Sequence, residues 1–503
     1  MPSITLDGKT LNFTPGESIL EIANRAGVEI PTLCKCDALE PLSSCLVCLV
    51  QLEPSGKMVP ACSTIATDKM EVRSECEAVL ELRRRAISLI LTDHQGDCLA
   101  PCTTVCPVEL DVPTMFAALA SGDNDAAIRT LYEQVALPGV LAYLCPAPCE
   151  KACRRTDAPL NICKMKEYVA DSQSTEKIAA VLQKDTETAD ALREKIVAVV
   201  GAGPSGLAAA LHLRVAGCTV VLLEQSNTAA PRLRADSELP SEVLDRDIQL
   251  IKQLGVELRL GCKVGEAVSL DALRRDFDAV LLAAGDGAHE ALQIPESSEL
   301  FLAGQMQAGK RALVGWSVQD GKIEAEAIVH FLLTGERREL EKPFTTRMKK
   351  LSDEQVRALF PAGFKEAAPR QEISTTISPE VAQREATRCL DCSCNKLDTC
   401  QLRYWAAKLK VPPPRMVPLP ERSLQLDTSH PQLSCEPGKC IACGICVGLT
   451  EQAEEPVGLS LNLRGYEVRV APPLGASMAE AVTSSLDAVT EACPTAALTK
   501  KDS

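Results

Sequence analysis

The chain has 503 residues, of which 46% are hydrophobic and 3% aromatic, and it carries a formal net charge of −15. That length allows roughly three to five domains, each large enough to bury a core. A strongly acidic chain repels phosphate backbones and anionic membranes, and few aromatic side chains are available to stack on bases. We therefore expect neither nucleic acid nor a membrane surface as a partner.

The first residues and the cysteine content bear on the compartment. The start, MPSITLDGKTLNF, has no basic region followed by an apolar one, so no secretory signal is expected. The most apolar stretch, residues 196–213, is interrupted by glycines and a proline and is not expected to span a membrane. Twenty-four cysteines in such a chain are more typical of metal ligands in a reducing compartment than of a disulfide scaffold, which predicts a cytoplasmic location.

Residues 1–75 are predicted to form a small α/β unit. A hairpin turns at Asp7-Gly8, and a short capped helix begins at Ser18. The spacing C-x10-C-x2-C-x13-C then relates Cys34, Cys45, Cys48 and Cys62. A 2Fe-2S cluster needs four thiolates that converge on a small volume, which such a loop can provide. A structural zinc site is the alternative, and Cys36 is expected to be a spare thiol.

The segments around these cysteines, IPTLCKCDALEPLSSCLVCLV and PACST, resemble the N-terminal ferredoxin-like domain of the large iron–sulfur subunit of respiratory complex I and of iron-only hydrogenases. The resemblance implies a β-grasp ferredoxin fold that holds a 2Fe-2S cluster. The family usually has Gly and Arg around the central C-x2-C, whereas this chain has Ser43, Ser44 and Leu46 there. We expect that difference to alter the reduction potential but not the ligation.

Residues 76–185 are predicted to be a helical domain that carries cysteines, with helical patterns at 76–95, 112–119 and 125–135 and a charged connector at 184–194. The segments HQGDCLAPCTTVCP, YLCPAPCEKACRR and LNICKMKEYVAD resemble the N-terminal domain of the glutamate synthase small subunit, which is also found in dihydropyrimidine dehydrogenase. That family holds two 4Fe-4S clusters on interleaved cysteines. The resemblance implies one cluster on Cys98, Cys102 and Cys153, and the other on Cys106, Cys145 and Cys149.

Each of these two sets lacks a fourth ligand, and here the chain departs from the family. His94 precedes Cys98 as a similarly placed histidine does in the complex I subunit, so it is a candidate for the first set. The special Glu or Gln ligand of the family falls at Lys166, a poor ligand, and Cys163 is the candidate for the second set. A surface histidine and a small buried thiol are the alternatives for these two residues.

Residues 186–335 are predicted to form a Rossmann-like domain. A buried strand from Ile196 leads into Gly201, Gly203 and Gly206, which form GxGxxG, and Glu224 ends the next strand. The glycines let a pyrophosphate approach the helix N-terminus, and the acid is placed to bind the adenosine ribose. The resemblance to the glutamate synthase family implies FAD as the ligand.

The family normally inserts a nicotinamide-binding domain later in the chain. Here FDAVLLAAG (residues 277–285) is followed almost at once by LFLAGQ (residues 300–305), which resembles the FAD-contacting segment with Gly304. So short a connection cannot form a βαβ unit, and the nicotinamide domain is expected to be absent. Gln305 stands where the family has Asp, and NTAAPRLRAD replaces its Gly-Gly segment. Bound FAD and an empty Rossmann scaffold both stay open.

Residues 336–430 are predicted to be a charged, proline-rich linker, and residues 431–503 a last cysteine-bearing module. The linker contains one compact group, Cys389, Cys392, Cys394 and Cys400, which is expected to hold either a 4Fe-4S cluster or zinc. The last module has the spacing of a bacterial-type 4Fe-4S ferredoxin site in Cys440, Cys443, Cys446 and Cys493. The expected spare thiols are Cys36, Cys76, Cys218, Cys262 and Cys435.

The predicted fold class is multidomain α/β: a β-grasp ferredoxin, a helical double-cluster domain, a reduced Rossmann-like FAD domain and a ferredoxin-like C-terminal module. The leading hypothesis is an oxidoreductase subunit that carries electrons through one 2Fe-2S cluster, about four 4Fe-4S clusters and FAD. Its partners would be dehydrogenase- or hydrogenase-type redox subunits or a soluble ferredoxin. The alternatives are an electron wire without a catalytic site and a zinc-rich scaffold.

Overall fold

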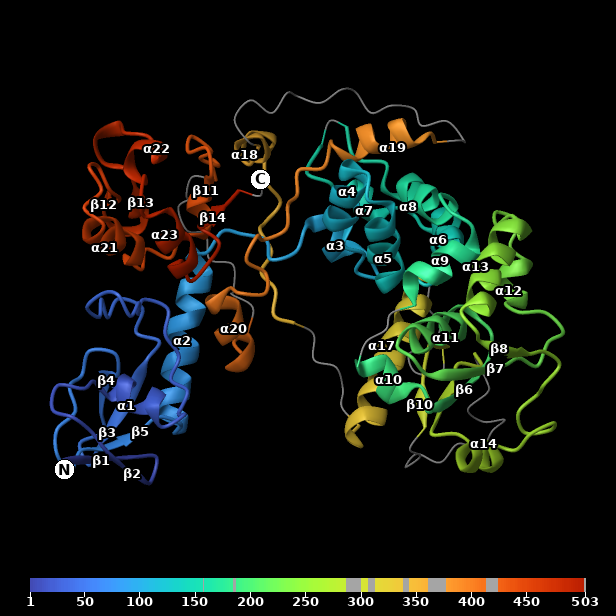
Figure 1. Ribbon diagram of the computed structural model, residues 1–503, viewed down its shortest axis with the longest axis horizontal. Helices are drawn as coiled ribbons and strands as arrows, with labels where there is room; N and C mark the ends of the chain where they lie inside the picture. The colour runs from blue at the N-terminus through green and yellow to red at the C-terminus, as the bar shows by residue number, and fades with distance from the viewer. Residues whose placement is uncertain are drawn as a thin grey trace. The chain divides into compact units, whose positions relative to one another are not determined.

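The computed structural model describes residues 1–156, 158–183, 187–285, 300–305, 313–337, 343–360, 377–412 and 424–501 (Figure 1). The chain forms two compact units, each assembled from segments that are distant in the sequence. Unit 1 comprises Met1–Leu99, Pro343–Glu366 and Ser393–Ser503, and unit 2 comprises Ala100–Lys342 and Ala367–Cys392. Within the described ranges, no helix combines the length and apolar character needed to cross a membrane. The division into five domains that the sequence suggested, with boundaries after residues 75, 185, 335 and 430, stays a prediction.

Unit 1 begins with a mixed five-stranded sheet in the order β2-β1-β5-β3-β4. Its strands are β1 (Ser3–Leu6), β2 (Lys9–Asn12), β3 (Leu49–Glu53), β4 (Lys57–Pro60) and β5 (Glu71–Arg73). The predicted hairpin turn is confirmed, because Asp7 and Gly8 have φ values of 47° and 82° between β1 and β2. The predicted helix is α1 (Ile19–Arg25), and Ser18 caps it reciprocally with Glu21.

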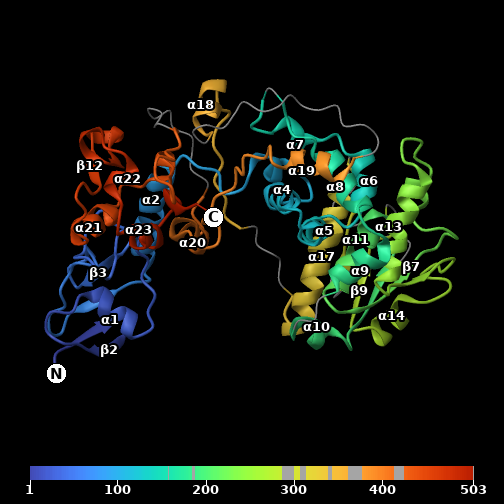
Figure 2. The ribbon, with the colours of Figure 1, turned by 45° about the horizontal axis from the view of Figure 1, so that its top comes forward.

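The rest of unit 1 consists of helices and two small sheets. Helix α2 (Glu77–Asp93) contacts α20 (Gln401–Lys408), and both views show these distant segments side by side (Figures 1 and 2). The remaining elements are α18 (Asp353–Ala358), β11 (Leu433–Cys435), η1 (Pro437–Lys439), α21 (Ile445–Gln452), β12 (Ser460–Asn462), η2 (Gly465–Glu467), β13 (Arg469–Ala471), η3 (Pro473–Gly475), α22 (Met478–Ala481), α23 (Leu486–Ala492) and β14 (Leu498–Lys500).

Unit 2 opens with a group of short helices, against which a returning segment packs. They are α3 (Pro101–Val105), α4 (Val112–Ser121), α5 (Asn124–Gln134), α6 (Pro138–Leu144), α7 (Pro148–Lys151), α8 (Ile162–Asp171), α9 (Thr175–Leu182) and α10 (Glu187–Leu192). Helix α10 lies where the sequence predicted only a connector. Helix α19 (Pro379–Ala386) contacts α4, so the chain comes back to this group after the sheet (Figures 1 and 2).

The second part of unit 2 is a five-stranded parallel sheet in the order β10-β9-β6-β7-β8. Its elements are β6 (Ile196–Val200), α11 (Pro204–Val215), β7 (Thr219–Leu223), α12 (Pro231–Arg234), α13 (Ser241–Gln253), β8 (Glu257–Arg259), α14 (Leu270–Asp276), β9 (Ala279–Leu282), β10 (Phe301–Leu302) and α17 (Val314–Thr334). The order reverses between β6 and β9, which is where doubly wound sheets bind ligands, beyond the carboxyl ends of the strands. A parallel sheet of the predicted Rossmann-like kind is therefore present.

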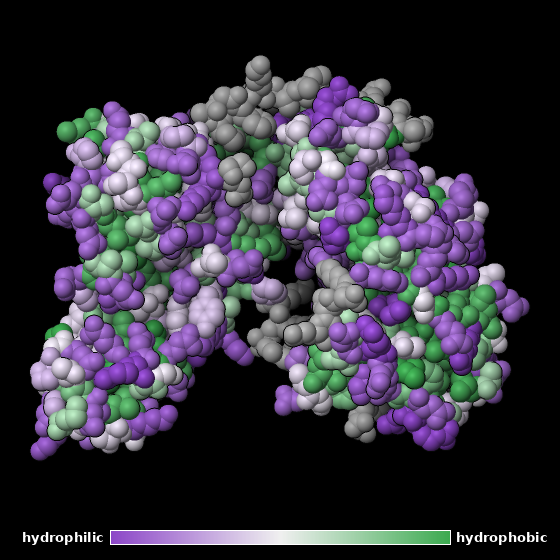
Figure 3. All heavy atoms as spheres, viewed as in Figure 1, coloured by the Kyte–Doolittle hydropathy of each residue, from purple (hydrophilic) through white to green (hydrophobic). Residues whose placement is uncertain are grey.

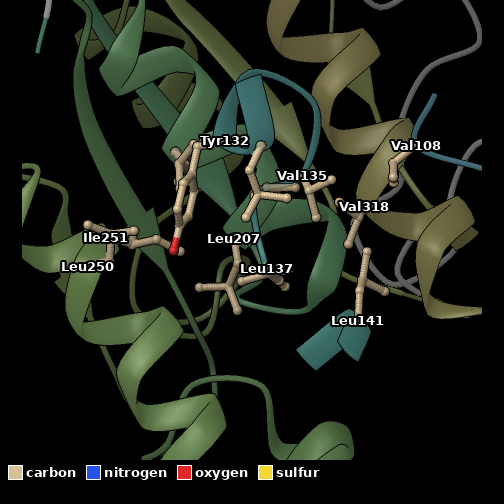
Figure 4. Close-up of a cluster of buried hydrophobic side chains, with 14 of the residues drawn as sticks. Val108, Tyr132, Val135, Leu137, Leu141, Leu207, Leu250, Ile251 and Val318 are labelled. Atoms are coloured by element: carbon tan, nitrogen blue, oxygen red, sulfur yellow. The ribbon is translucent and has the colours of Figure 1, made fainter. Parts of the chain in front are cut away.

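One hydrophobic core joins the helices and the sheet of unit 2. Tyr132 and Leu137 from the helical group meet Leu207 of α11 and Ile251 of α13 in this core (Figure 4). Helices α11 and α17 approach closely because Gly321 has no side chain, since a Cβ there would lie 2.1 Å from the Ser205 carbonyl oxygen. The surface, by contrast, is mainly hydrophilic on the face shown in Figure 3, as the high charge content requires.

Candidate metal-cluster and dinucleotide sites

The N-terminal thiols converge on the loop between α1 and β3. The Cys34 and Cys45 sulfurs lie 3.3 Å apart, and the thiols of Cys48 and Cys62 are also neighbours. Within each pair, the hydrogen bond between the thiols lowers the pKa of Cys34 and of Cys62 and raises the pKa of the partner thiol, Cys45 or Cys48. One sulfur of each pair is therefore biased toward the thiolate form that iron binds. The structure thus brings together the four residues predicted for the 2Fe-2S cluster.

The backbone of this loop explains why the family favours glycine there. Ser43 and Leu46 have φ values of 52° and 54°, in the left-handed region that glycine adopts without strain. The Ser43 hydroxyl lies 3.5 Å from the Cys62 sulfur. The loop therefore adopts left-handed backbone angles at Ser43 and Leu46 without glycine. Ser43 also places a hydroxyl group beside the Cys62 sulfur.

Sequence reasoning missed a buried cation beside this site. Arg83 is 2% exposed and donates through Nε to the Leu49 carbonyl oxygen at 3.0 Å. Burial lowers its pKa to about 10, and the nearby Cys48 thiol opposes that shift. Arg83 lies between Val79 and Ile87 at four-residue spacing on the buried face of α2. A charge at a core position of a helix is the sequence signal that could have identified it.

The C-terminal thiols share one apolar pocket. The pocket is lined by Cys440, Cys443, Cys446 and Cys493, the four residues predicted for a 4Fe-4S cluster, and also by Cys435. Gly444, at φ 83°, begins α21 and lets the chain turn between Cys443 and Cys446. Burial raises the pKa of Cys443 to about 12. Thiolates therefore need a cationic centre here, which an iron–sulfur cluster would be.

The two cysteine loops of unit 1 are in contact. Ser44 donates through Oγ to the Cys443 carbonyl oxygen at 3.4 Å. Leu42 packs against Gly444, because its Cδ1 atom would lie 3.4 Å from a Cβ placed on that glycine. Cys34 is also close enough to Cys443 that its thiol helps to raise the Cys443 pKa, after the larger effects of burial and of Cys493 and Cys440. The first and last cysteine groups of the sequence are thus neighbours.

A third cysteine group of unit 1 contains Cys98, Cys394 and Cys400. The Cys394 amide donates to the Cys98 carbonyl oxygen at 3.0 Å. Burial raises the pKa of Cys400 to about 11, with further increases from the neighbouring Cys394 and Cys98. The His94 imidazole and the Lys439 side chain both lie beside the place where a Gly96 Cβ would begin, with the His94 Nε2 atom 3.2 Å from it. Burial opposes a raised pKa of Lys439, but the lysine is close enough to Cys394 for that thiol to help raise it.

In unit 2, Cys145, Cys149 and Cys163 form a connected group near Cys106. Hydrogen bonding with Cys163 raises the pKa of Cys145, and Cys163 also contacts Cys149. Helix α3, which precedes Cys106, packs against α7, which carries Cys149. The structure thus places Cys163 with the second family set, where the sequence predicted a fourth ligand.

Lys166 lies within this group and is 5% exposed. Its ammonium donates to the Leu141 carbonyl oxygen at 3.3 Å. Burial would lower its pKa, but the thiols of Cys163, Cys145 and Cys149, and of Cys106 further away, raise the pKa overall. Lys166 therefore places a positive charge beside these sulfurs and does not act as a ligand.

The other group of unit 2 consists of Cys102, Cys153, Cys389 and Cys392. Burial raises the pKa of Cys102, and the nearby thiols of Cys392, Cys389 and Cys153 raise it further. Burial also raises the pKa of Cys389 to about 11, with Cys153 among the contributing neighbours. Cys102, Cys153 and Cys389 all pack against the same core.

This arrangement differs from the sets that the sequence suggested. Cys98 belongs to unit 1, whereas Cys102 and Cys153 belong to unit 2. The compact group at 389–400 is likewise divided, with its first two cysteines in unit 2 and its last two in unit 1. The structure describes all 24 cysteines, and none of them is in a disulfide. Among the described residues, no group of three or more His, Cys, Asp or Glu side chains converges as the ligands of a single bound metal ion would.

The predicted glycine loop lies at the reversal point of the parallel sheet. Gly201, at φ 103°, follows β6, and a Cβ there would lie 2.6 Å from the Ala283 carbonyl oxygen beyond β9. A Cβ on Gly206 would lie 1.8 Å from the Gly201 carbonyl oxygen, so this helix turn requires glycine. At Gly203 a Cβ would meet no atom within 4 Å in the part of the chain that the structure describes, its chain neighbours aside. The loop leaves open space above the N-terminus of α11, which fits a pyrophosphate.

The acid of the fingerprint is also in place. Glu224, 6% exposed, accepts hydrogen bonds from the amides of Ala202 at 2.8 Å and Ser226 at 2.9 Å. Each carboxylate oxygen keeps a second lone pair with which to accept a ribose hydroxyl. Arg232 donates to the Gln305 side-chain oxygen at 2.8 Å, beside Gly304. The two departures from the family, Gln305 and the segment that contains Arg232, therefore contact each other.

Three family models match successive parts of the chain. The 2Fe-2S iron–sulfur cluster binding domain matches residues 2–77. Domain II of dihydropyrimidine dehydrogenase, with its 4Fe-4S cluster, matches residues 95–178. An FAD binding domain matches residues 194–291. These matches confirm the predicted cofactor classes: a 2Fe-2S domain, a 4Fe-4S domain and an FAD-binding domain.

Relatives match less than half of the chain. The NADP(+)-dependent formate dehydrogenase subunit beta of Moorella thermoacetica is 34% identical over 221 residues, which are 40% of this chain and 31% of the relative. The NADPH-Fe(3+) oxidoreductase subunit beta of Geobacter sulfurreducens is 31% identical over 235 residues, 44% of this chain and 34% of the relative. The glutamate synthase [NADPH] small chain of Mycobacterium tuberculosis is 34% identical over 205 residues, 40% of this chain and 41% of the relative.

The match spans about a third of the length of the first two relatives. The matched relatives are a formate dehydrogenase subunit, an NADPH-Fe(3+) oxidoreductase subunit and a glutamate synthase small chain. The chain therefore resembles, as its motifs predicted, the glutamate synthase small-subunit type of iron–sulfur and FAD protein, with a 2Fe-2S domain at its N-terminus.

Proposed function

We propose that this chain is an electron-transfer subunit of a larger oxidoreductase, in which about five iron–sulfur clusters and one FAD connect partner redox subunits. The observation that carries the proposal is the contact between the first and last cysteine groups of unit 1, through Ser44 and the Cys443 carbonyl oxygen. Two cysteine loops in contact would hold their clusters close enough for an electron to pass between them. A scaffold that used its metals only for stability would not need this arrangement.

The third cysteine group of unit 1 extends the same route. Gln401, which follows Cys400, donates through its amide to the Pro494 carbonyl oxygen at 3.0 Å, next to Cys493. Lys396 also donates through Nζ to the Cys493 carbonyl oxygen at 2.9 Å. Three cysteine groups in unit 1 are thus linked by hydrogen bonds between the residues that flank them. We assign the β-grasp ferredoxin fold to residues 1–75 and a ferredoxin-like fold to residues 431–503.

In unit 2, the glycine loop and Glu224 would hold FAD, whose chemistry allows paired electrons to be exchanged for single ones. The protein contributes the open space at Gly203, the free amide groups at the start of α11 and the carboxylate that accepts from the ribose. We propose dehydrogenase- or hydrogenase-type subunits, or a soluble ferredoxin, as the partners, and a cytoplasmic location. The relatives named as formate dehydrogenase and NADPH-Fe(3+) oxidoreductase subunits support a partner of the dehydrogenase type.

One observation favours a second candidate, an electron wire whose Rossmann scaffold is empty. The Arg232–Gln305 hydrogen bond joins two residues at positions where the family makes flavin contacts. If this contact closes the flavin position, the sheet acts only as a structural support. The clusters would then carry electrons without a flavin.

The deciding experiment is the analysis of the full-length chain purified anaerobically. We expect about 18 irons, from one 2Fe-2S and four 4Fe-4S clusters, and about one FAD for each chain. Chemical reduction should bleach the flavin and produce EPR signals from several clusters. Iron without flavin would replace the first proposal by the electron wire. Zinc in place of iron would contradict both.

A further inference from the structure

The short segment from Cys389 to Cys400 holds four cysteines within twelve residues, a density that ordinarily indicates one metal site. In the fold, however, the boundary between the two compact units falls inside this segment, after Cys392. The two halves of the segment are fixed by different contacts. These contacts decide which other cysteines each half meets.

The first half is anchored in unit 2 by a buried polar network. Arg388, immediately before Cys389, pairs with Glu385 at 2.6 Å and donates to the Ala158 carbonyl oxygen at 2.5 Å. Glu385 also accepts from the Asn161 amide at 2.8 Å. Arg155 donates through Nε to the Arg388 carbonyl oxygen. This network ties the chain before Cys389 to the chain after Cys153.

The second half is anchored in unit 1. The Cys394 amide donates to the Cys98 carbonyl oxygen at 3.0 Å, so these two residues are held by adjacent backbone. Cys98 is held in turn by Thr346, whose carbonyl oxygen accepts from the Cys98 amide at 3.2 Å and whose amide lies 3.3 Å from the Cys98 sulfur. Cys400 begins α20, with its sulfur 3.5 Å from the Arg403 amide. Cys98 and Cys400 are both buried.

We propose that this cysteine segment is shared between two 4Fe-4S clusters and is not the site of a third metal centre of its own. The inference rests on the proposed electron-transfer function and assigns its ligands. The unit 2 cluster would be held by Cys102, Cys153, Cys389 and Cys392. The unit 1 cluster would be held by His94, Cys98, Cys394 and Cys400.

Each set has four ligands, which is the number that a 4Fe-4S cluster requires. Each thiol gives its proton to solvent as its iron–sulfur bond forms. The sharing also explains how the helical domain completes its cluster. With Cys98 assigned to the unit 1 cluster, Cys102 and Cys153 need two further ligands, and Cys389 and Cys392 provide them. Cys106, Cys145, Cys149 and Cys163 remain a separate set.

The test compares iron content in serine variants of the full-length chain. Under the proposal, C389S/C392S and C394S/C400S each lose about four irons, and the quadruple variant loses about eight. If all four residues bind one cluster, every variant loses the same four irons, and the quadruple loses no more than either double. Zinc released from either double variant would also overturn the proposal. The controls are C76S in unit 1 and C262S in unit 2, which should keep the full iron content.

Single serine variants provide a second measurement in case the double variants do not fold, since each keeps an oxygen ligand at its site. C102S and C389S should alter the same EPR signal of the reduced chain, and C98S and C400S should alter a different one. A common signal altered by C389S and C400S would overturn the proposal, and the wild-type iron and flavin contents would still support the electron-transfer function. A wild-type chain without iron would overturn both.

Discussion

The Ser43 hydroxyl lies 3.5 Å from the Cys62 sulfur, and Ser43 holds this position with φ at 52°. A hydrogen bond from Ser43 contributes to the lowered pKa of Cys62, after the larger effects of the bond from Cys48 and the opposing effect of burial. The same hydroxyl would stabilise added negative charge on a sulfur-ligated cluster. We therefore expect Ser43, a residue that departs from the family pattern, to raise the reduction potential of the cluster.

We expect Ser43→Ala to lower the reduction potential of the 2Fe-2S cluster by about 40 mV. The loss of a hydrogen bond worth about 1 kcal/mol corresponds to this shift in a one-electron couple. Redox titration followed by EPR measures the shift. Ser55→Ala is the control, because Ser55 is exposed in the turn between β3 and β4 and its hydroxyl bonds locally, to Leu52 and Lys57. An unchanged potential in Ser43→Ala would show that the hydroxyl does not reach the cluster.

Lys166 gives a prediction of the same sign in unit 2. Its ammonium is buried among the thiols of Cys163, Cys145 and Cys149. Lys166→Met should lower the potential of the cluster held there, because the positive charge no longer stabilises the reduced state. A buried unit charge next to a cluster, at an effective dielectric constant of about 20, is worth on the order of 2–3 kcal/mol, or about 100 mV for a one-electron couple.

The matched control for Lys166→Met is Lys164→Met on the same helix. Lys164 is 44% exposed and pairs with Glu167 at 2.7 Å, so solvent screens its charge. EPR-monitored titration should show a large shift for residue 166 and little for residue 164. Equal shifts in the two variants would mean that the effect comes from the net charge of the chain and not from a buried contact.

Local patterns predicted the parts of this fold that depend on short-range contacts. The Asp7-Gly8 turn and the Ser18 cap were predictable because their hydrogen bonds lie within a few residues. The groups of Cys34 and Cys440 were likewise visible as loops with the spacing of cluster ligands. Most of their ligands approach one another within a single loop.

The division of the 389–400 segment between two cysteine groups could not be predicted from local sequence patterns. It depends on the Asn161–Glu385 hydrogen bond and on the Cys394–Cys98 backbone bond, each of which joins residues more than two hundred positions apart. Spacing alone placed these four cysteines together because they are close in sequence. The buried charge of Lys166 was hidden for a similar reason, since the thiols that surround it come from three separate segments.

Asp247 makes the stability of unit 2 depend on pH. This residue is 4% exposed on α13 and accepts from the Val140 amide at 3.0 Å. Burial raises its pKa to about 7 despite that bond. The folded state therefore binds a proton more tightly than the unfolded state, and this contribution is complete below about pH 4 and is lost as pH rises through about 7.

Between pH 6 and pH 8 the contribution of Asp247 to the free energy of unfolding should fall by about 1.4 kcal/mol. Asp247→Asn should remove that part of the pH dependence, which urea midpoints at the two pH values would show. Asp245→Asn is the control, since Asp245 lies on the same helix with its side chain 57% exposed and pairs with Arg234. A pH dependence unchanged in Asp247→Asn would contradict the assignment.

Substitutions at two glycines of the dinucleotide loop should distinguish loss of FAD binding from loss of stability. Apart from its chain neighbours, no atom of the described residues lies within 4 Å of a Cβ at Gly203, and Gly203 has a φ of −80°, which alanine adopts readily. We therefore expect Gly203→Ala to keep its fold and its iron while losing FAD, because the new methyl group enters the space left for the pyrophosphate. The measurements are flavin and iron per chain and the melting temperature.

Gly206→Ala should behave differently, since its Cβ would lie 1.8 Å from the Gly201 carbonyl oxygen. The helix start must then move, so this variant should lose flavin and melt at a lower temperature. Leu260→Ala, at a side chain 42% exposed after β8, should keep both flavin and stability. Full flavin content in Gly203→Ala would show that FAD does not approach this loop, and it would favour the electron wire with an empty Rossmann scaffold.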